Sequence, residues 1–73
     1  MLKLYHVDED GAFEKEELIQ TDAIQILDVA AALRENGYRD FVLTGNFASR
    51  YKLEFKTSSR YAYIDIVREE DEV

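Results

Sequence analysis

Residues 50–56 read RYKLEFK and residues 61–68 read YAYIDIVR, and in both runs apolar side chains alternate with polar ones. Such alternation is typical of β-strands that bury one face. Thr57, Ser58 and Ser59 separate the runs and favour a turn, so we expect two adjacent antiparallel strands. The core side is expected to consist of Tyr51, Leu53, Phe55, Ala62, Ile64 and Ile66. The opposite side is expected to carry Arg50, Lys52, Glu54, Lys56, Tyr61, Tyr63 and Asp65.

A helix is expected before these strands, over residues 22–36. Thr21 or Asp22 can cap its N-terminus, and Asp22 with Gln25 has the spacing of a capping box. One stripe at helical spacing is expected to face the core, formed by Ala23, Ile26, Leu27, Ala30 and Leu33. Gly37 stands where a left-handed C-terminal cap is favoured, and we expect Tyr38 to fold back against the last turn.

The remaining segments complete a small sheet. Residues 2–7 alternate as a strand with either face inward, and residues 8–11 favour a turn. Residues 12–19 fit either a second strand or the start of a helix, whereas residues 40–44 fit a short strand before a turn at Gly45 and Asn46. The predicted fold is α+β, with one helix on a four- or five-stranded, mainly antiparallel sheet. The order is strand, helix and three strands, with an extra strand before the helix left open.

The composition indicates one small globular domain. The chain has 73 residues, of which 47% are hydrophobic, and it contains no cysteine. We expect a single domain over residues 1–68 followed by an acidic tail over residues 69–73. No apolar run approaches the ~20 residues that a membrane span requires, and the N-terminus lacks a signal-peptide layout. These features favour a cytoplasmic protein that does not bind membranes.

The charge is strongly negative and unevenly distributed. The net charge is -7, and residues 1–37 contain nine acidic but only three basic residues. Residues 38–68 contain six basic and three acidic residues, and residues 69–73 add four acidic ones. Such a field repels nucleic acids at long range and attracts basic surfaces, so direct nucleic-acid binding is not favoured.

The residues that catalysis requires are sparse. His6 is the only histidine, no cysteine is available as a nucleophile, and the three glycines are scattered rather than grouped in a phosphate loop. A lone imidazole in a strand is most simply a half-buried packing residue. We therefore expect neither enzymatic activity nor a cofactor.

Residues 6–17, HVDEDGAFEKEE, resemble the calcium-binding loop of EF-hand proteins. In that loop, alternating carboxylates and a final glutamate converge on Ca²⁺ around a sharp turn at glycine. The matching residues are Asp8, Asp10, Gly11, Phe13 and Glu17. His6 occupies the first ligand position, however, and only five residues precede it, too few for an entering helix. An acidic hairpin turn explains the same residues, so we assign no metal ligand and keep a calcium-binding loop as an alternative.

The leading hypothesis is a small acidic protein that binds and inhibits another protein. Carboxylates on a rigid scaffold can occupy a basic groove that normally receives phosphates. By size and charge, the chain is similar to phage-encoded inhibitors of nucleic-acid-handling proteins, of the anti-restriction or anti-CRISPR type. The expected contact residues are Asp8, Glu9, Asp10, Glu14, Glu16 and Glu17, with Tyr61 and Tyr63 as secondary anchors.

Two other modes of binding remain open. Tyr61 and Tyr63 beside Arg50, Lys52 and Lys56 could form a platform for single-stranded nucleic acid or for a protein. An exposed edge strand could instead pair with a second copy to give a homodimer.

Overall fold

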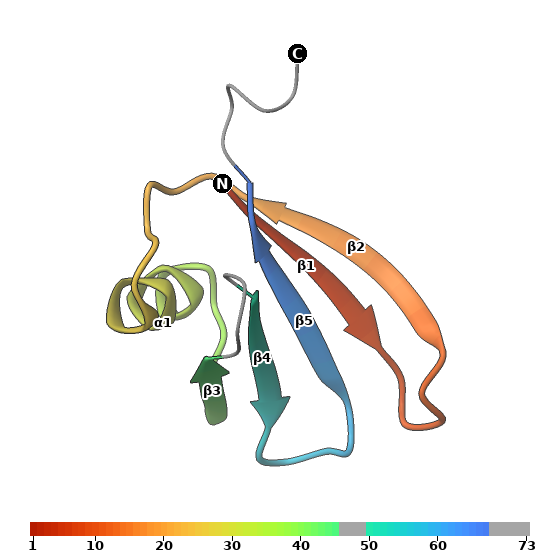
Figure 1. Cartoon of the computed structure of the whole chain (residues 1–73). Coiled ribbons are helices and arrows are strands. Elements are labelled where there is room, and N and C mark those ends of the chain that lie inside the picture. The colour runs from red at the N-terminus through yellow and green to blue at the C-terminus, as the bar shows by residue number, and fades with distance from the viewer. Residues whose placement is uncertain (46–49, 68–73) are drawn as a thin grey trace.

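The structure is a computed structural model that describes residues 1–45 and 50–67. Five strands and one helix follow one another in the order β1, β2, α1, β3, β4, β5 (Figure 1). Their bounds are β1 Leu2–Val7, β2 Phe13–Ile19, α1 Ile26–Glu35, β3 Phe41–Gly45, β4 Arg50–Phe55 and β5 Tyr61–Ile66. Residues 12–19, which the sequence left between strand and helix, therefore form an edge strand.

The five strands form one antiparallel sheet in the order β2-β1-β5-β4-β3. The helix packs against one face, which confirms the predicted α+β fold with its extra strand before the helix. Short turns join β1 to β2 and β4 to β5 at the same end of the sheet (Figure 1). The pairing of β1 with β5 places the first and last strands side by side, with Leu2 opposite Ile66 and Val7 opposite Tyr61.

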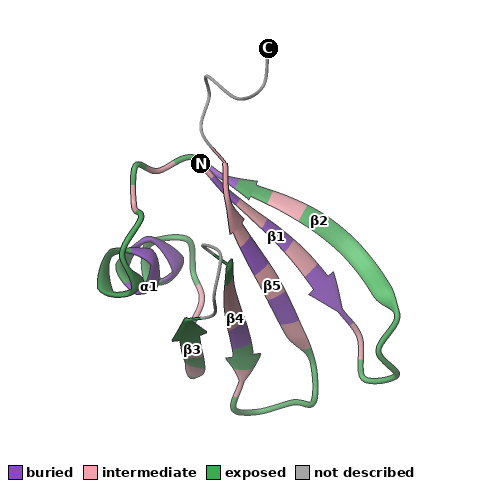
Figure 2. Ribbon diagram, in the orientation of Figure 1, coloured by how far each residue is buried: buried purple, intermediate pink, exposed green. Residues whose placement is uncertain are grey.

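The core lies between α1 and the middle strands (Figure 2). Leu2 and Leu4 of β1 are fully buried, and Leu4 lies directly opposite Ile64 of β5. Because paired antiparallel residues share a face, the register gathers the apolar side chains under the helix. The core cluster consists of Leu2, Leu4, Ile19, Val29, Ala32, Leu33, Leu53, Ala62 and Ile64. The inward assignments made for β4 and β5 are confirmed.

The start and the buried face of the helix differ from the prediction. The helix begins at Ile26 rather than at residue 22, and its N-cap, Gln25, makes no side-chain hydrogen bond. The chain leaves β2 at one edge of the sheet and crosses toward the side of β3 and β4 before the helix begins (Figure 1). This crossing keeps residues 20–24 non-helical, so the predicted capping box does not form.

The buried stripe of α1 is Val29, Ala30, Ala32 and Leu33. Leu27, which was expected to face the core, is 80% exposed, and Ile26 is 38% exposed. The predicted stripe was wrong at these two positions. Packing against the sheet fixes the rotation of the helix about its axis, and this rotation turns Ile26 and Leu27 toward solvent. Apolar spacing alone does not specify the rotation of a short helix about its axis.

The C-terminal end of the helix follows the prediction. Gly37 has a φ of +95°, in the left-handed region that glycine adopts without cost. Its amide donates to the carbonyl of Arg34, and the amide of Tyr38 donates to the carbonyl of Leu33, each at 3.1 Å. This pair of hydrogen bonds is a Schellman motif, and it turns the chain so that Tyr38 returns over the sheet.

Several strand boundaries shift by one or two residues. The third strand runs Phe41–Gly45 rather than over residues 40–44, because Asp40 adopts a φ of +53° that is incompatible with a strand. The strands β4 and β5 end at Phe55 and Ile66, earlier than residues 56 and 68. The predicted turn residue Asn46 and the acidic tail over residues 69–73 lie outside the described residues.

Within the part of the chain that the structure describes, no helix has the length and apolarity needed to cross a membrane.

The two leucines of α1 provide a test of the rotation of the helix. Leu33→Ala should lower the free energy of unfolding by about 2–5 kcal/mol, because Leu33 is fully buried and its removal leaves a cavity. Leu27→Ala should change it by less than about 0.5 kcal/mol, because Leu27 is exposed. Urea unfolding followed by circular dichroism measures both. Equal losses for the two variants would contradict the observed rotation.

Candidate functional site

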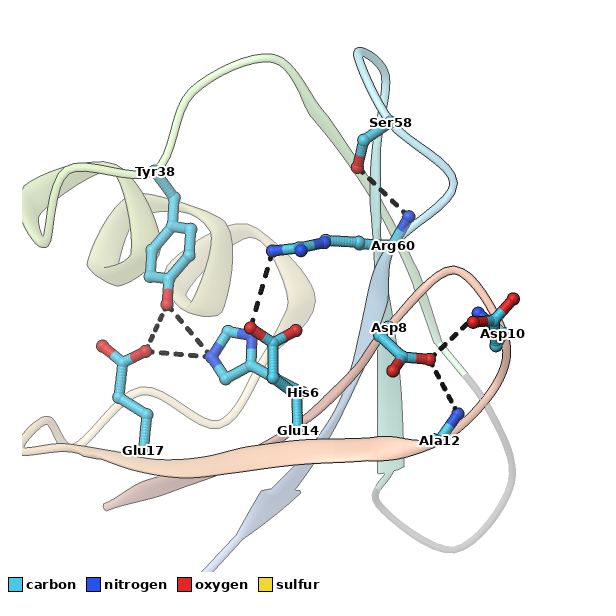
Figure 3. A network of polar contacts seen from close by, with 9 residues as sticks. All are labelled: His6, Asp8, Asp10, Ala12, Glu14, Glu17, Tyr38, Ser58 and Arg60. Carbon is cyan, nitrogen blue, oxygen red and sulfur yellow. Dashed lines mark hydrogen bonds and ion pairs between the residues drawn. The ribbon is translucent and has the colours of Figure 1, made fainter.

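The acidic turn between β1 and β2 is organised by Asp8. One carboxylate oxygen of Asp8 accepts hydrogen bonds from the amides of Asp10 and Ala12, each at 2.9 Å (Figure 3). Gly11 has a φ of +83° and closes the turn. Asp8 therefore shapes the turn, whereas Glu9 and Asp10 are exposed at its tip. Of the three predicted contact residues in this turn, Glu9 and Asp10 are therefore the two that are exposed to solvent.

The glutamates of β2 do not form one acidic surface. Glu16 lies opposite Tyr5 on the face away from the helix and pairs with Lys3 at 3.2 Å. Glu17 lies opposite Leu4 on the helix side, and Glu14 approaches Arg60 at 3.5 Å. The alternation of the strand separates neighbouring side chains onto opposite faces. The acidic cluster expected from the sequence is therefore divided, and each of its β2 members has a partner within the chain.

The residues that resemble an EF-hand loop form the hairpin of β1 and β2. Asp8 lies in the turn, whereas Glu17 lies along β2 opposite Leu4 and is directed toward His6 and Tyr38 (Figure 3). Among residues 1–45 and 50–67, no three His, Cys, Asp or Glu side chains are grouped so that they could hold a metal ion.

A partly buried polar network joins β1, β2 and the segment after α1. The Nε2 atom of His6 lies 2.9 Å from Oε1 of Glu17, and the hydroxyl of Tyr38 donates to the same carboxylate oxygen. The Tyr38 hydroxyl also lies 3.3 Å from His6 Nε2, which completes a triangle of contacts (Figure 3). His6 is only 8% exposed. It is a packing residue, as predicted, but one with defined polar partners.

The network shifts the pKa values of two of its members. Burial by itself would raise the pKa of Glu17, but the hydrogen bonds from Tyr38 and His6 hold that pKa below its ordinary value. Burial raises the pKa of Tyr38, and the hydrogen bond to the Glu17 carboxylate raises it further. Glu17 is therefore an ionised acceptor and Tyr38 a neutral donor near neutral pH. This polarity holds Tyr38 in a fixed position over the sheet.

No pattern in the sequence identifies this network. His6 and Glu17 share a face only because of the β1–β2 register, and that register includes an irregularity between His6 and Val7. Tyr38 reaches them through the turn after the helix. The Schellman signal at Gly37 indicated the direction of Tyr38 but not its partners.

The outer face of the sheet, which is the face opposite α1, carries the tyrosines predicted there. Tyr61 and Tyr63 pack edge to face with their ring centroids 5.5 Å apart, and Tyr63 lies opposite Tyr5 on β1. All three rings are partly exposed. Exposed apolar side chains extend the surface on the edge strands, with Phe13 at 62% and Val42 at 44%.

Cations on the outer face are paired or stacked. Arg50 makes a bidentate ion pair with Asp65 at 2.7 and 2.9 Å, and its guanidinium lies 5.5 Å from the Tyr63 ring centroid. The ammonium group of Lys52 lies 4.8 Å from the Tyr61 ring centroid. The hydrogen bond to Asp65 raises the pKa of Arg50, and the hydrogen bond to Glu16 raises the pKa of Lys3. Lys56 was predicted to lie on the outer face with Arg50 and Lys52. It instead follows the end of β4 and lines a separate hollow with Arg34 and Arg39.

Over residues 1–45 and 50–67, the structure thus defines a small α+β domain whose aromatic sheet face is not covered by another element and whose helix side holds a partly buried His-Glu-Tyr network. Comparisons of the chain with protein-family models, with curated protein sequences and with solved structures found no significant match. Function is therefore inferred from the side chains and contacts described above.

The network predicts a specific dependence of stability on pH. Because the folded state lowers the pKa of Glu17 below its ordinary value of 4.5, the stabilisation is complete above that value and is lost as the pH falls through the folded pKa. Glu17→Gln should be less stable than the wild type near neutral pH, and the difference should shrink on acidification. Thermal unfolding across the acidic range measures this.

Glu9→Gln serves as the control for this measurement, because it removes an exposed carboxylate at the turn. Its stability should follow the wild type at each pH. A difference between wild type and Glu17→Gln that stays constant with pH would contradict the role of the ionised carboxylate.

Proposed function

We propose that the protein acts by binding another protein through the outer face of its sheet, and that this partner has a basic surface. The observation that carries the proposal is the uncovered sheet face on which Tyr5, Tyr61 and Tyr63 lie side by side. In the described part of the chain, no helix or loop packs over this face (Figure 1).

The composition of this face favours a protein interface. Tyrosine and arginine are enriched among the residues that contribute most to protein–protein binding. Here the tyrosine rings are held by one another and by Arg50 and Lys52, so binding would immobilise few side chains. Phe13 and Val42 enlarge the apolar area at the two edges. A pre-organised aromatic centre with polar surroundings is the usual arrangement of such an interface.

The distribution of charge favours a basic protein over a nucleic acid. Cations that already form ion pairs contribute less to phosphate binding, and Arg50 and Lys3 are paired with Asp65 and Glu16. The net charge of the chain is -7, and Glu9 and Asp10 are exposed at the turn between β1 and β2. This negative charge repels nucleic acid and accelerates association with a basic surface.

The target class that fits best is a protein that handles nucleic acids. Such proteins carry Lys- and Arg-lined grooves, and a small acidic domain seated in one would block access to it. This is the mode of action of an inhibitor of the anti-restriction or anti-CRISPR type, and it requires no catalysis. The open acidic tip and the aromatic face would contact the rim and the wall of the groove.

Site-specific photo-crosslinking tests which face binds. A photoreactive benzoylphenylalanine replaces Tyr61 on the outer face or Leu27 on the exposed side of α1, and each variant is irradiated in a bacterial lysate. We expect position 61, but not position 27, to capture a protein with a basic surface, identified by mass spectrometry. Capture from position 27 alone, or of nucleic acid alone from position 61, would overturn the proposal.

Two sets of substitutions separate the aromatic from the electrostatic contribution. Tyr61→Ala combined with Tyr63→Ala should weaken binding of the captured partner by at least about tenfold. Glu9→Gln combined with Asp10→Asn should weaken it less and reduce its dependence on salt, because exposed charges at an interface rim mainly affect association. Asp8 is left intact because it holds the turn.

Leu27→Ala is the matched control for these variants, and circular dichroism verifies that each variant folds. Isothermal titration calorimetry at two salt concentrations gives the affinities. Unchanged affinity in the double tyrosine variant would exclude the outer face as the binding surface.

A further inference from the structure

A hollow of about 310 Å³ opens on the helix side of the sheet, near the turns that join β1 to β2 and β4 to β5. It lies on the opposite side of the sheet from the tyrosine face and is not used by the proposed protein interface. Its volume is at the lower limit for sites that bind small molecules. Most of its lining residues belong to two groups, one aromatic and one charged or hydroxylated.

The aromatic group forms a fixed wall. His6 and Tyr38 are stacked with their ring centroids 6.3 Å apart, and Tyr38 and Phe55 are stacked at 6.1 Å. The interplanar angles are 17° and 26°, so the Tyr38 ring is close to parallel with each of the other two. Glu17 fixes the Tyr38 hydroxyl and the His6 imidazole from the side. The wall is therefore formed before any ligand arrives, which lowers the entropic cost of binding.

The charged and hydroxylated residues that line the hollow include two cations at its rim. Lys15 belongs to β2, and it lines the hollow together with Arg60. Arg60 immediately precedes β5, and its side chain extends toward Glu14 (Figure 3). The hydroxyl oxygen of Ser58 accepts a hydrogen bond from the Arg60 amide at 3.1 Å, so the β4–β5 turn holds Ser58 beside Arg60. Two cations and a hydroxyl at one rim are unusual in a chain of net charge -7.

Among the described residues that line the hollow, Glu14 is the only carboxylate, and it approaches Arg60 at 3.5 Å. This separation is longer than that of a strong charge-assisted hydrogen bond, and both side chains are substantially exposed, at 37% for Glu14 and 53% for Arg60. The contact is therefore weak. The position of the Glu14 carboxylate marks where an anion can contact the Arg60 guanidinium. A ligand with better hydrogen-bond geometry could displace this carboxylate.

We propose that this hollow binds a small organic anion. A phosphate or carboxylate group would pair with Arg60 and Lys15, and the apolar body of the ligand would lie against Tyr38 and Phe55. The guanidinium of Arg60 is suited to a planar or tetrahedral anion because it can donate two parallel hydrogen bonds. Glu14 competes with the ligand for Arg60, so the Glu14 carboxylate partly occupies the anion-binding position when no ligand is bound.

Titrations followed by two-dimensional ¹H–¹⁵N NMR test the site with four probes. These are phenyl phosphate, benzoate, inorganic phosphate and the neutral benzyl alcohol. We expect saturable shifts of the amides of Tyr38, Ser58 and Arg60 with an aromatic anion, and weaker binding of inorganic phosphate and benzyl alcohol. Binding of phenyl phosphate in preference to benzoate would identify a phosphate ligand, and the reverse order a carboxylate.

Two substitutions at the rim should act in opposite directions. Arg60→Gln should weaken binding of the preferred probe by about tenfold or more, because a charge-assisted pair is lost. Glu14→Gln should strengthen it, because the competing carboxylate is removed. Arg50→Gln and Glu16→Gln make the same chemical changes on the outer face and should leave the affinity unchanged.

All four residues lie at least partly exposed, so the variants should fold, and their NMR spectra verify this. The proposal is overturned if none of the anions gives saturable shifts around Tyr38 and Arg60. It is also overturned if benzyl alcohol binds as tightly as phenyl phosphate, or if Arg60→Gln leaves the affinity unchanged.

Discussion

The antiparallel pairing of β1 with β5 is the constraint on which the rest of the structure depends. Each of the other strand pairs joins segments that are neighbours in sequence, whereas this pair joins Leu2 to Ile66. It is extended at the ends by Met1 and Val67, whose backbone groups exchange hydrogen bonds at 3.0 and 2.8 Å. Closing so long a loop costs chain entropy, and the burial of Leu2, Leu4 and Ile64 offsets it.

The same register assigns different chemistry to the two faces of the sheet. On β1, Tyr5 joins Tyr63 on the outer face, while its neighbour His6 lies on the helix side among Glu17 and Tyr38. A shift of one residue would exchange these positions and place charged side chains in the core. The aromatic face and the polar network are therefore consequences of one alignment, and neither could change independently of the other.

The acidic residues of the β1–β2 hairpin fall into two groups. Asp8, Glu14, Glu16 and Glu17 each interact within the domain, and they hold a turn, two ion pairs and the partly buried network. Glu9 and Asp10 remain exposed at the turn. Counting charges therefore overstates the negative surface that this part of the chain offers to a partner. In the proposed interface, the carboxylates that remain exposed at this turn are few, and the tyrosines of the outer face supply most of the contact area.

The sequence by itself determined the α+β class, the faces of β4 and β5, and the helix end at Gly37. These features depend on local alternation and on backbone preferences that neighbouring residues control. Only the tertiary structure decided the helix start, the exposure of Leu27, the division of the β2 glutamates and the union of His6, Glu17 and Tyr38. These depend on strand register and on the path across the sheet, which arise from contacts between residues distant in sequence.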